Sequence, residues 1–313
     1  MRPELFNLFD VSFPAYFVLL ITGFTFATAI AVVHARRLGE NPDVIVDLAL
    51  AALLMGVVGG RVFHVLFDGY LLDYVHLCTK PAAVDWHITK AACVSERYRG
   101  VWDAVKGVCH PAETDCFAWA RFWAGGLTYY GGLVFAVAAG IWLLRRDRFD
   151  VWKAADLSSV GVAVGLGFGR MGCLLAGCCF GTPYDGLGAL TFPPRGAASE
   201  AQHKVGLLKS GSEWSVPVHP AQIYESAASF AIAAFCMLYL HGRKKYDGHV
   251  FLAFLGLYAL ARFLLEWLRA DDRGGLVGLS TSQLIGLAIA AAALVIHQRK
   301  KSAAMAAMAS MGG

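Results

Sequence analysis

Charged side chains are scarce in this sequence. Aspartate, glutamate, lysine and arginine make up 16% of the 313 residues, hydrophobic residues make up 57%, and the mean hydropathy is +0.54. Soluble domains average about 25% charged residues, and a water-soluble globule has no interior large enough to hide so much apolar surface. The shortage of charge therefore excludes an ordinary soluble protein and indicates an integral membrane protein.

A cleavable signal peptide is the second missing feature. The segment before the first apolar stretch is acidic rather than basic and offers no small-residue cleavage site, so we expect that stretch to remain as a membrane span. Stretches of about 20 apolar residues can cross a bilayer, and lipid requires their backbone groups to be satisfied within helices. The expected fold class is all-α, with about seven transmembrane helices. The expected spans are residues 13–33, 44–67, 125–144, 154–175, 220–241, 249–268 and 281–297.

Basic clusters follow the first, third, fifth and seventh of these spans. They are Arg36 and Arg37; Arg145, Arg146 and Arg148; Arg243, Lys244 and Lys245; and Arg299, Lys300 and Lys301. Short cytoplasmic loops are enriched in lysine and arginine. We therefore expect the amino terminus outside and the carboxyl terminus in the cytoplasm of a plasma membrane; the family resemblance described below implies a bacterial plasma (inner) membrane.

The expected domain organisation is simple. Residues 1–301 form one seven-helix membrane domain, with an external loop at 68–122 and a proline-containing external arm at 182–218. The low-complexity tail at 302–313 is expected to be disordered in the cytoplasm.

Cysteine is absent from the predicted cytoplasmic loops, and four of the eight cysteines fall in the external loop. These four are Cys78, Cys93, Cys109 and Cys116. An oxidising compartment favours one or two disulfides there, and four cysteines allow three pairings. Free thiols, or a metal site that includes one of the loop histidines, are the alternatives, although no CxxC spacing points to zinc.

Three further cysteines lie where the fourth span meets the outer face: Cys173, Cys178 and Cys179. Adjacent cysteines rarely bond to each other without strain, and thiol reactivity depends on a lowered pKa that a sequence does not give. Two interpretations stay open. The three are either small packing residues or a site of redox, metal or thiol-transfer chemistry.

Arginines lie inside three of the spans. Arg61, Arg170 and Arg262 all fall in the outer half of the membrane, where the accompanying carboxylates are Glu225 and Glu266. Buried charge in lipid is kept where it faces a partner or a cavity, and Glu266 stands one helical turn after Arg262, on the same face. Three arginines exceed two carboxylates, so we expect an anion there. The planar guanidinium suits a phosphate, and a phosphate at this depth is most naturally that of a phospholipid headgroup.

Several motifs in chain order carry a family resemblance. They are Tyr16 before an apolar span; Gly59-Gly60-Arg61; Gly125-Gly126-Leu127-Thr128-Tyr129-Tyr130-Gly131-Gly132; Gly169-Arg170-Met171-Gly172; His219-Pro220-Ala221-Gln222-Ile223-Tyr224-Glu225; Tyr258 with Arg262 and Glu266; and Ser282-Gln283. Nearly end to end, the chain resembles the prolipoprotein diacylglyceryl transferase family. That family moves diacylglycerol from phosphatidylglycerol to the lipobox cysteine of a prolipoprotein.

The resemblance implies a set of site residues. Those expected to be catalytic are Arg170, Arg262, Tyr130, Tyr258 and Tyr16. Those expected to bind substrate are Arg61, Gly126, Gly172, Gly181, His219, Gln222, Tyr224 and Glu266. The expected partners are phosphatidylglycerol, or a related anionic phospholipid, and a prolipoprotein signal peptide. We expect a monomer with no cofactor, no metal and no nucleic-acid partner.

Two departures from the family pattern bear on the chemistry. Tyr130 stands where the family typically has a histidine that activates the incoming thiol, and Cys173 and Cys178 replace an asparagine and an acidic residue. The alternative function is therefore a diverged paralogue that keeps the lipid-binding cage but uses Cys173, Cys178 and Cys179 for redox, metal or thiol chemistry. A transporter-like scaffold is disfavoured because no strong inverted repeat is visible.

Overall fold

A computed structural model describes residues 4–8, 11–95, 98–122, 126–270, 274–276 and 278–311. The chain divides into two compact units, one of Met1–Ile45 with Phe149–Gly313 and the other of Val46–Arg148. The second unit has internal packing of its own, between its two long helices and within its disulfide-bonded loop.

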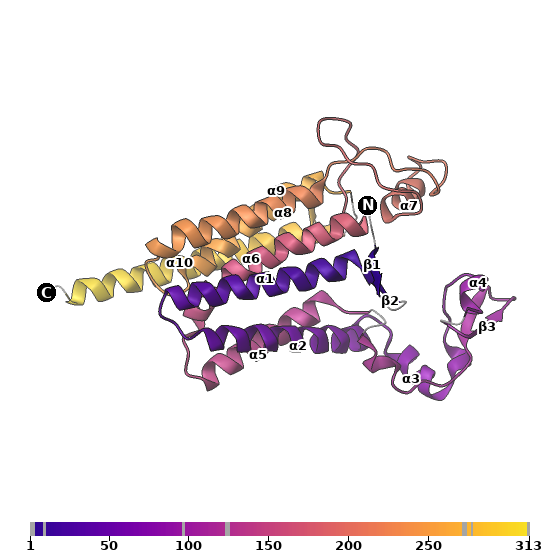
Figure 1. Ribbon diagram of the computed structural model, residues 1–313, viewed down its shortest axis with the longest axis horizontal. Coiled ribbons are helices and arrows are strands. Elements are labelled where there is room, and N and C mark those ends of the chain that lie inside the picture. The colour runs from indigo at the N-terminus through magenta and orange to yellow at the C-terminus, as the bar shows by residue number, and fades with distance from the viewer. Residues whose placement is uncertain are drawn as a thin grey trace. The chain divides into compact units, whose positions relative to one another are not determined.

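The first unit is a helical bundle. Its long helices run side by side in Figure 1, where α6 packs against α1, α8 and α9, and α10 packs against α9. These helices are α1 (Ala15–Arg37), α6 (Val151–Ala176), α8 (Ala221–Ala234), α9 (His249–Leu265) and α10 (Thr281–Met311). The π-helical segment η4 (Phe235–Leu240) and the 3₁₀ turn η5 (His241–Arg243) continue α8, and η6 (Glu266–Leu268) continues α9.

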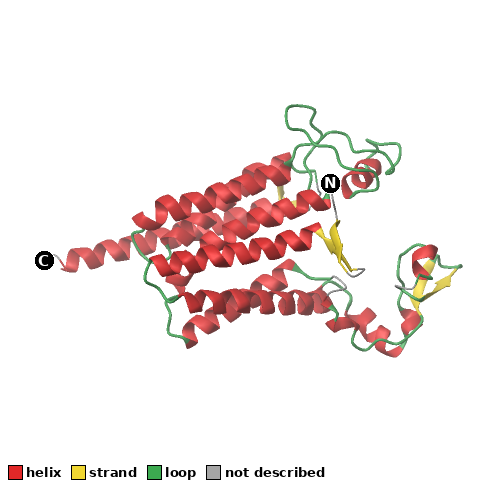
Figure 2. Ribbon diagram, in the orientation of Figure 1, coloured by secondary structure: helices red, strands yellow, loops and turns green. Residues whose placement is uncertain are grey.

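Short hairpins flank this bundle. Strands β1 (Glu4–Leu8) and β2 (Val11–Pro14) pair before α1, and β5 (Gly275–Leu276) and β6 (Leu279–Ser280) pair before α10. Figure 2 shows how small the strands are beside the helices. In the described part of the chain they form only two-stranded antiparallel sheets.

Glycine allows α1 and α6 to approach closely. A Cβ atom at Gly161 would lie 3.2 Å from the carbonyl oxygen of Ala27, and one at Gly23 would collide with Phe168. Small residues bring helices together in this way in membranes, where contact between helices replaces the hydrophobic effect. The same seam continues into the core around Val160 and Ala163.

A carboxylate on α6 fixes the start of α9. The side chain of Asp156 is fully buried, and its two oxygens accept the backbone N–H groups of Gly248 at 2.9 Å and Phe251 at 3.0 Å. The first N–H groups of a helix lack partners within the helix, and a capping carboxylate usually precedes the helix in sequence. Here the cap comes from another helix, so it also ties α6 to α9.

Replacing Asp156 by alanine should lower the free energy of unfolding by about 1–3 kcal/mol, because two buried N–H groups lose their acceptor. Asp156→Asn keeps one side-chain oxygen and should lose less. Thermal unfolding in detergent measures both. Equal melting temperatures for Asp156→Ala and the unmodified protein would show that the cap contributes nothing.

An arm with its own small core joins α6 to α8. It includes α7 (Ala197–Lys204), and it packs Phe180, Phe192, Ala198 and Val218 together. In Figure 1 it lies at the end of the bundle where α6 ends. Residues 182–218 form most of this loop-rich segment, and their external position stays a prediction.

The second unit joins two helices through a disulfide-bonded loop. Helices α2 (Pro42–Phe67) and α5 (Tyr129–Arg146) touch where Gly59 meets Phe135. The loop holds two disulfides, Cys78–Cys116 and Cys93–Cys109, so its four cysteines adopt one of the three possible pairings. The elements of the loop are α3 (Leu71–Thr79), η1 (Pro81–Ala83), α4 (Lys90–Cys93), β3 (Gly100–Asp103), β4 (Val108–Pro111) and η2 (Ala118–Ala120).

Six helices in the described residues are long and apolar enough to cross a membrane. They match six of the seven predicted spans, and the multi-pass membrane fold is confirmed. Helix α5, at the third predicted span, is not among them because arginines fill its last turn. The sidedness of the helices stays a prediction.

The carboxyl-terminal segment also differs from expectation. Helix α10 continues to Met311, into the residues predicted to form a disordered tail. Alanine and methionine are strong helix formers, so a run of them prolongs the helix. Residues 312 and 313 lie outside the described part.

Candidate functional site

Three arginines of the first unit converge on one carboxylate. Glu225, on α8, accepts Arg170 Nε at 2.5 Å, Arg269 Nη1 at 2.6 Å and Arg262 Nη1 at 3.2 Å. Arg262 Nη2 also pairs with Glu266 at 2.7 Å, as its spacing predicted. Three positive and two negative charges give the five side chains of this arginine–glutamate cluster a formal net charge of +1.

The three arginines differ in exposure. The side chain of Arg170 is 18% exposed, that of Arg262 10% and that of Arg269 1%. Glu225 engages Arg170 through Nε alone. Within the described residues, the two terminal nitrogens of Arg170 make no hydrogen bond or ion pair. Arg170 therefore presents two donors in a fixed orientation, and a bidentate fork of this kind is what a phosphate accepts.

Glu266 also accepts a hydrogen bond from outside the arginine–glutamate cluster. Its Oε1 accepts the hydroxyl of Ser280 at 2.7 Å. Gln283 secures that turn by accepting the N–H of Ser280 at 3.0 Å and by donating to the carbonyl of Phe263 at 3.3 Å. The β5–β6 hairpin and the start of α10 thus brace the cluster.

Arg269 and Ser280 were not among the sequence-predicted site residues. Arg269 follows the predicted sixth span and therefore counted as a loop residue. The one available signal was its position two helical turns after Arg262. Ser280 donates to Glu266, 14 residues earlier in the sequence. Helical periodicity does not predict a contact at that separation.

The end of α6 brings the three cysteines together. Gly177 ends the helix in the left-handed conformation, with φ +76°, as glycine commonly does. The sulfur atoms of Cys173, Cys178 and Cys179, here called the cysteine trio, then lie within 4.8 Å of one another, and all three residues are partly buried. Hydrogen bonds from the thiols of Cys173 and Cys178, and then from Arg269, lower the pKa of the Cys179 thiol.

Tyr16 and Tyr258 lie near the same place. Tyr16 is close enough to Arg170 and the cysteine trio for electrostatic interaction, and Tyr258 interacts with Arg170 in the same way. Gly172 makes room for Tyr16, since a Cβ there would lie 3.0 Å from the tyrosine ring.

The residues predicted around the arm form an adjacent layer. The backbone N–H of Gly181 donates to the carbonyl of His219 at 3.1 Å, and the His219 ring stacks on Tyr184 at 3.9 Å. Tyr224 lies 6.2 Å from that ring, centroid to centroid. Gln222, fully buried, donates to the carbonyl of Cys178 at 2.7 Å. These contacts hold the arm and the α6 end in register.

Three predicted residues belong to the second unit instead. Tyr130 is 55% exposed at the start of α5. Arg61 donates to the carbonyls of Trp119 at 2.6 Å, Ala118 at 2.7 Å and Gly126 at 3.2 Å, so its guanidinium braces the loop. Gly125, which precedes Gly126 in the motif, lies outside the described residues.

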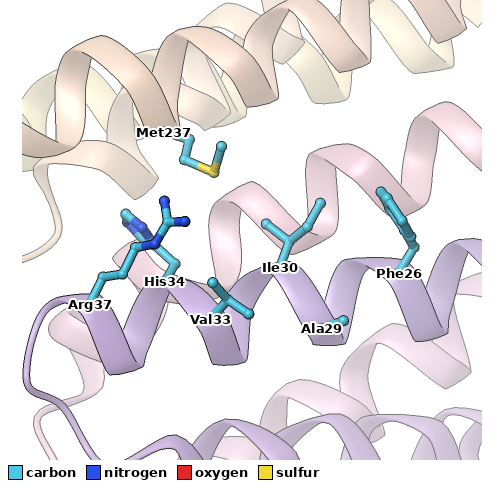
Figure 3. Close-up of a pocket in the computed structure, with 7 residues that line it drawn as sticks. All are labelled: Phe26, Ala29, Ile30, Val33, His34, Arg37 and Met237. Atoms are coloured by element: carbon cyan, nitrogen blue, oxygen red, sulfur yellow. The ribbon is translucent and has the colours of Figure 1, made fainter.

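An apolar groove of about 260 Å³ lies elsewhere on the first unit. Figure 3 shows it lined by Phe26 and Arg37 of α1 and by Met237 of η4. The last turn of α1 borders it, whereas Tyr16 is in the first turn. At 1.5 Å per residue the groove extends along α1 from about 15 Å beyond Tyr16, at Phe26, to about 30 Å beyond it, at Arg37. Its lining includes no residue of the arginine–glutamate cluster, so the groove is separate from the site around Arg170.

Comparison with known proteins assigns the chain to a family. Residues 3–90 and 108–298 match the sequence model of prolipoprotein diacylglyceryl transferase. The chain is 26% identical over 290 residues to the phosphatidylglycerol–prolipoprotein diacylglyceryl transferase of Clostridium tetani, covering 92% of this chain and 93% of the relative. It is 27% identical over 276 residues to the enzyme of the same name from Geobacter sulfurreducens, covering 86% and 83%. This chain belongs to the prolipoprotein diacylglyceryl transferase family.

Proposed function

We propose that this protein transfers diacylglycerol from phosphatidylglycerol to the lipobox cysteine of a prolipoprotein. The observation that carries the proposal is the geometry of Arg170. Its Nε is fixed by Glu225 while both terminal nitrogens remain available to a ligand. The relatives named above carry this activity in their names, and the helices that hold the site are membrane-spanning candidates.

The reaction has a clear electrostatic requirement. The acceptor thiolate attacks a glycerol carbon of the lipid, a C–S bond forms, and the C–O bond to the phosphate breaks. Negative charge then builds on the departing glycerol phosphate. Arg170 donates to that phosphate, and the net positive charge of the arginine–glutamate cluster stabilises it further. Preorganised donors in a water-poor site are the strongest means of such stabilisation.

The remaining residues have proposed roles around this centre. Tyr16 and Tyr258 orient the lipid headgroup beside Arg170. Arg262 and Arg269, more deeply buried, hold Glu225 and supply charge rather than direct contact. His219, Gln222 and the arm form the place where the signal peptide docks.

Tyr130 is proposed to act as an orienting hydroxyl, and Arg61 and Gly126 to bind substrate, as the family resemblance implies. The protein is proposed to act as a monomer, with its amino terminus outside and its carboxyl terminus in the cytoplasm.

The proposed function is tested by transfer of labelled diacylglycerol from phosphatidylglycerol to a lipobox peptide, with the purified protein in nanodiscs. We expect transfer by the unmodified protein and none by Arg262→Ala, because that change leaves Glu266 without its ion-pair partner and lowers the positive charge of the site. Absence of transfer by folded protein that still binds phosphatidylglycerol would overturn the proposal and favour the cysteine-based alternative.

A further inference from the structure

The cysteine trio differs from every other cysteine in the described chain. Four cysteines form disulfides and Cys236 is buried by itself in the bundle core, whereas Cys173, Cys178 and Cys179 are unbonded, partly buried and mutually close. Their sulfur atoms all lie within 4.8 Å of one another. Three soft ligands on one short segment at this separation are the first requirement of a thiolate metal site.

The backbone is shaped to keep the sulfurs together. The N–H of Cys178 donates to the carbonyl of Cys173 at 3.1 Å, which folds the chain back over the helix end. Cys179 has φ +61°, a left-handed conformation that costs a non-glycine residue about 1 kcal/mol or more. The buried Gln222 side chain fastens the turn through the Cys178 carbonyl. The conformation is thus held in place by its surroundings.

We propose that Cys173, Cys178 and Cys179 bind one zinc ion as thiolates and leave its fourth position open for the thiol of the acceptor. Zinc sites that act in catalysis use three protein ligands and one exchangeable position. With Zn–S bonds of about 2.3 Å, a tetrahedral site separates its sulfurs by about 3.8 Å. The distance between any two of the sulfur atoms therefore needs to shorten by at most about 1 Å. This inference departs from the sequence-based expectation of no metal.

The charge of the site supports zinc. Zinc with three thiolates carries a net charge of −1, and the arginine–glutamate cluster carries +1. Arg269 joins the two groups, since it pairs with Glu225, forms a backbone bridge with Gly181 and interacts with the Cys179 sulfur. An arginine beside a bare cation would repel it, but beside an anionic zinc–thiolate group it is attractive.

The role of the metal rests on the proposed function. Binding of zinc releases one proton from each of the three cysteines to water. The acceptor thiol then takes the fourth position and gives up its proton to water, because a thiol that coordinates a metal is deprotonated outright. The sulfur attacks the glycerol carbon, the C–O bond to the phosphate breaks, and glycerol phosphate leaves with the electron pair. No oxidant or reductant is needed.

The metal site is tested by loading the purified full-length protein with Zn²⁺ or Co²⁺ and measuring bound metal and thiolate-to-cobalt charge-transfer absorption. We expect about one metal per chain with the absorption of three thiolates. Cys178→Ser should lower the affinity by more than about 100-fold, since even loss of an outer-shell partner costs 10- to 100-fold. Cys236→Ala is the matched control and should keep the metal.

Measurements on the unmodified protein keep the test independent of how the variants fold. Zinc should protect the trio from alkylating reagents, as mapped by mass spectrometry. A disulfide between two of the three cysteines, or full alkylation in the presence of zinc, would overturn the site.

A second experiment distinguishes a failure of this inference from a failure of the proposed function. Addition of a lipobox peptide should shift the cobalt spectrum, whereas the same peptide with serine in place of the cysteine should not. A spectral shift without lipid transfer would leave the metal site standing and refute the proposed donor or reaction. Lipid transfer at the same rate by metal-free protein would refute the metal role and leave the transferase standing.

Discussion

Replacing Glu225 by alanine is expected to lower the free energy of unfolding by about 3–5 kcal/mol. Glu225 is 5% exposed and is the shared partner of Arg170, Arg262 and Arg269. Its removal leaves three neighbouring guanidinium groups without their shared carboxylate in a poorly solvated site. Removing one partner of a buried ion pair destabilises a protein far more than replacing both partners by apolar residues, because the remaining charge stays buried without compensation.

The experiment is denaturant or thermal unfolding of the detergent-solubilised protein. Ser229→Ala is the matched control, because Ser229 lies one turn along the same helix and only donates to the Glu225 carbonyl at 2.8 Å. That variant should lose no more than about 1 kcal/mol. Glu225→Gln, which keeps the shape but not the charge, should fall between the two. Similar unfolding of Glu225→Ala and Ser229→Ala would mean that the arginines are stabilised by something other than this carboxylate.

Replacing Arg170 by alanine is expected to reduce kcat/KM for lipid transfer by about 10²- to 10³-fold, the loss typical of removing one donor aimed at developing charge. The folded state should change little, because Arg170 is the most exposed of the three arginines and gives Glu225 only its Nε. Arg170→Lys should recover part of the rate, since it restores a charge without the two-pronged donor.

The comparison with Arg269→Ala makes this prediction specific. Arg269 is 1% exposed, so its removal should lower stability and rate together, whereas Arg170→Ala should affect the rate alone. Rates are measured with labelled phosphatidylglycerol and a lipobox peptide, and stabilities by thermal unfolding. Transfer by Arg170→Ala at the unmodified rate would rule out Arg170 as the phosphate ligand.

Most of the membrane architecture could be predicted because long apolar runs are a local property of the sequence. The fourth span, predicted at 154–175, is α6 at Val151–Ala176. The pairing of Arg262 with Glu266 was equally accessible, since both lie on one face of one helix. Local periodicity is sufficient information in each case.

The features that were not predicted depend on contacts between distant segments. Glu225 was one of two candidate carboxylates, but its contacts with α6 and with Arg269 arise from helix packing that no spacing encodes. Arg61 was grouped with Arg170 by its depth in the membrane, yet its guanidinium is satisfied by carbonyls 57 and 58 residues later.

The contact between α1 and α6 has a consequence for how a lipid can reach its site. A hydrocarbon tail needs a gap at least as wide as a methyl group, and at Gly161 a single added carbon would already lie 3.2 Å from the Ala27 carbonyl oxygen. No acyl chain can pass between the two helices at the level of Gly161 while they remain packed there. If Arg170 binds the lipid phosphate as proposed, the lipid is expected to approach it along the faces of α6 that α1 leaves uncovered.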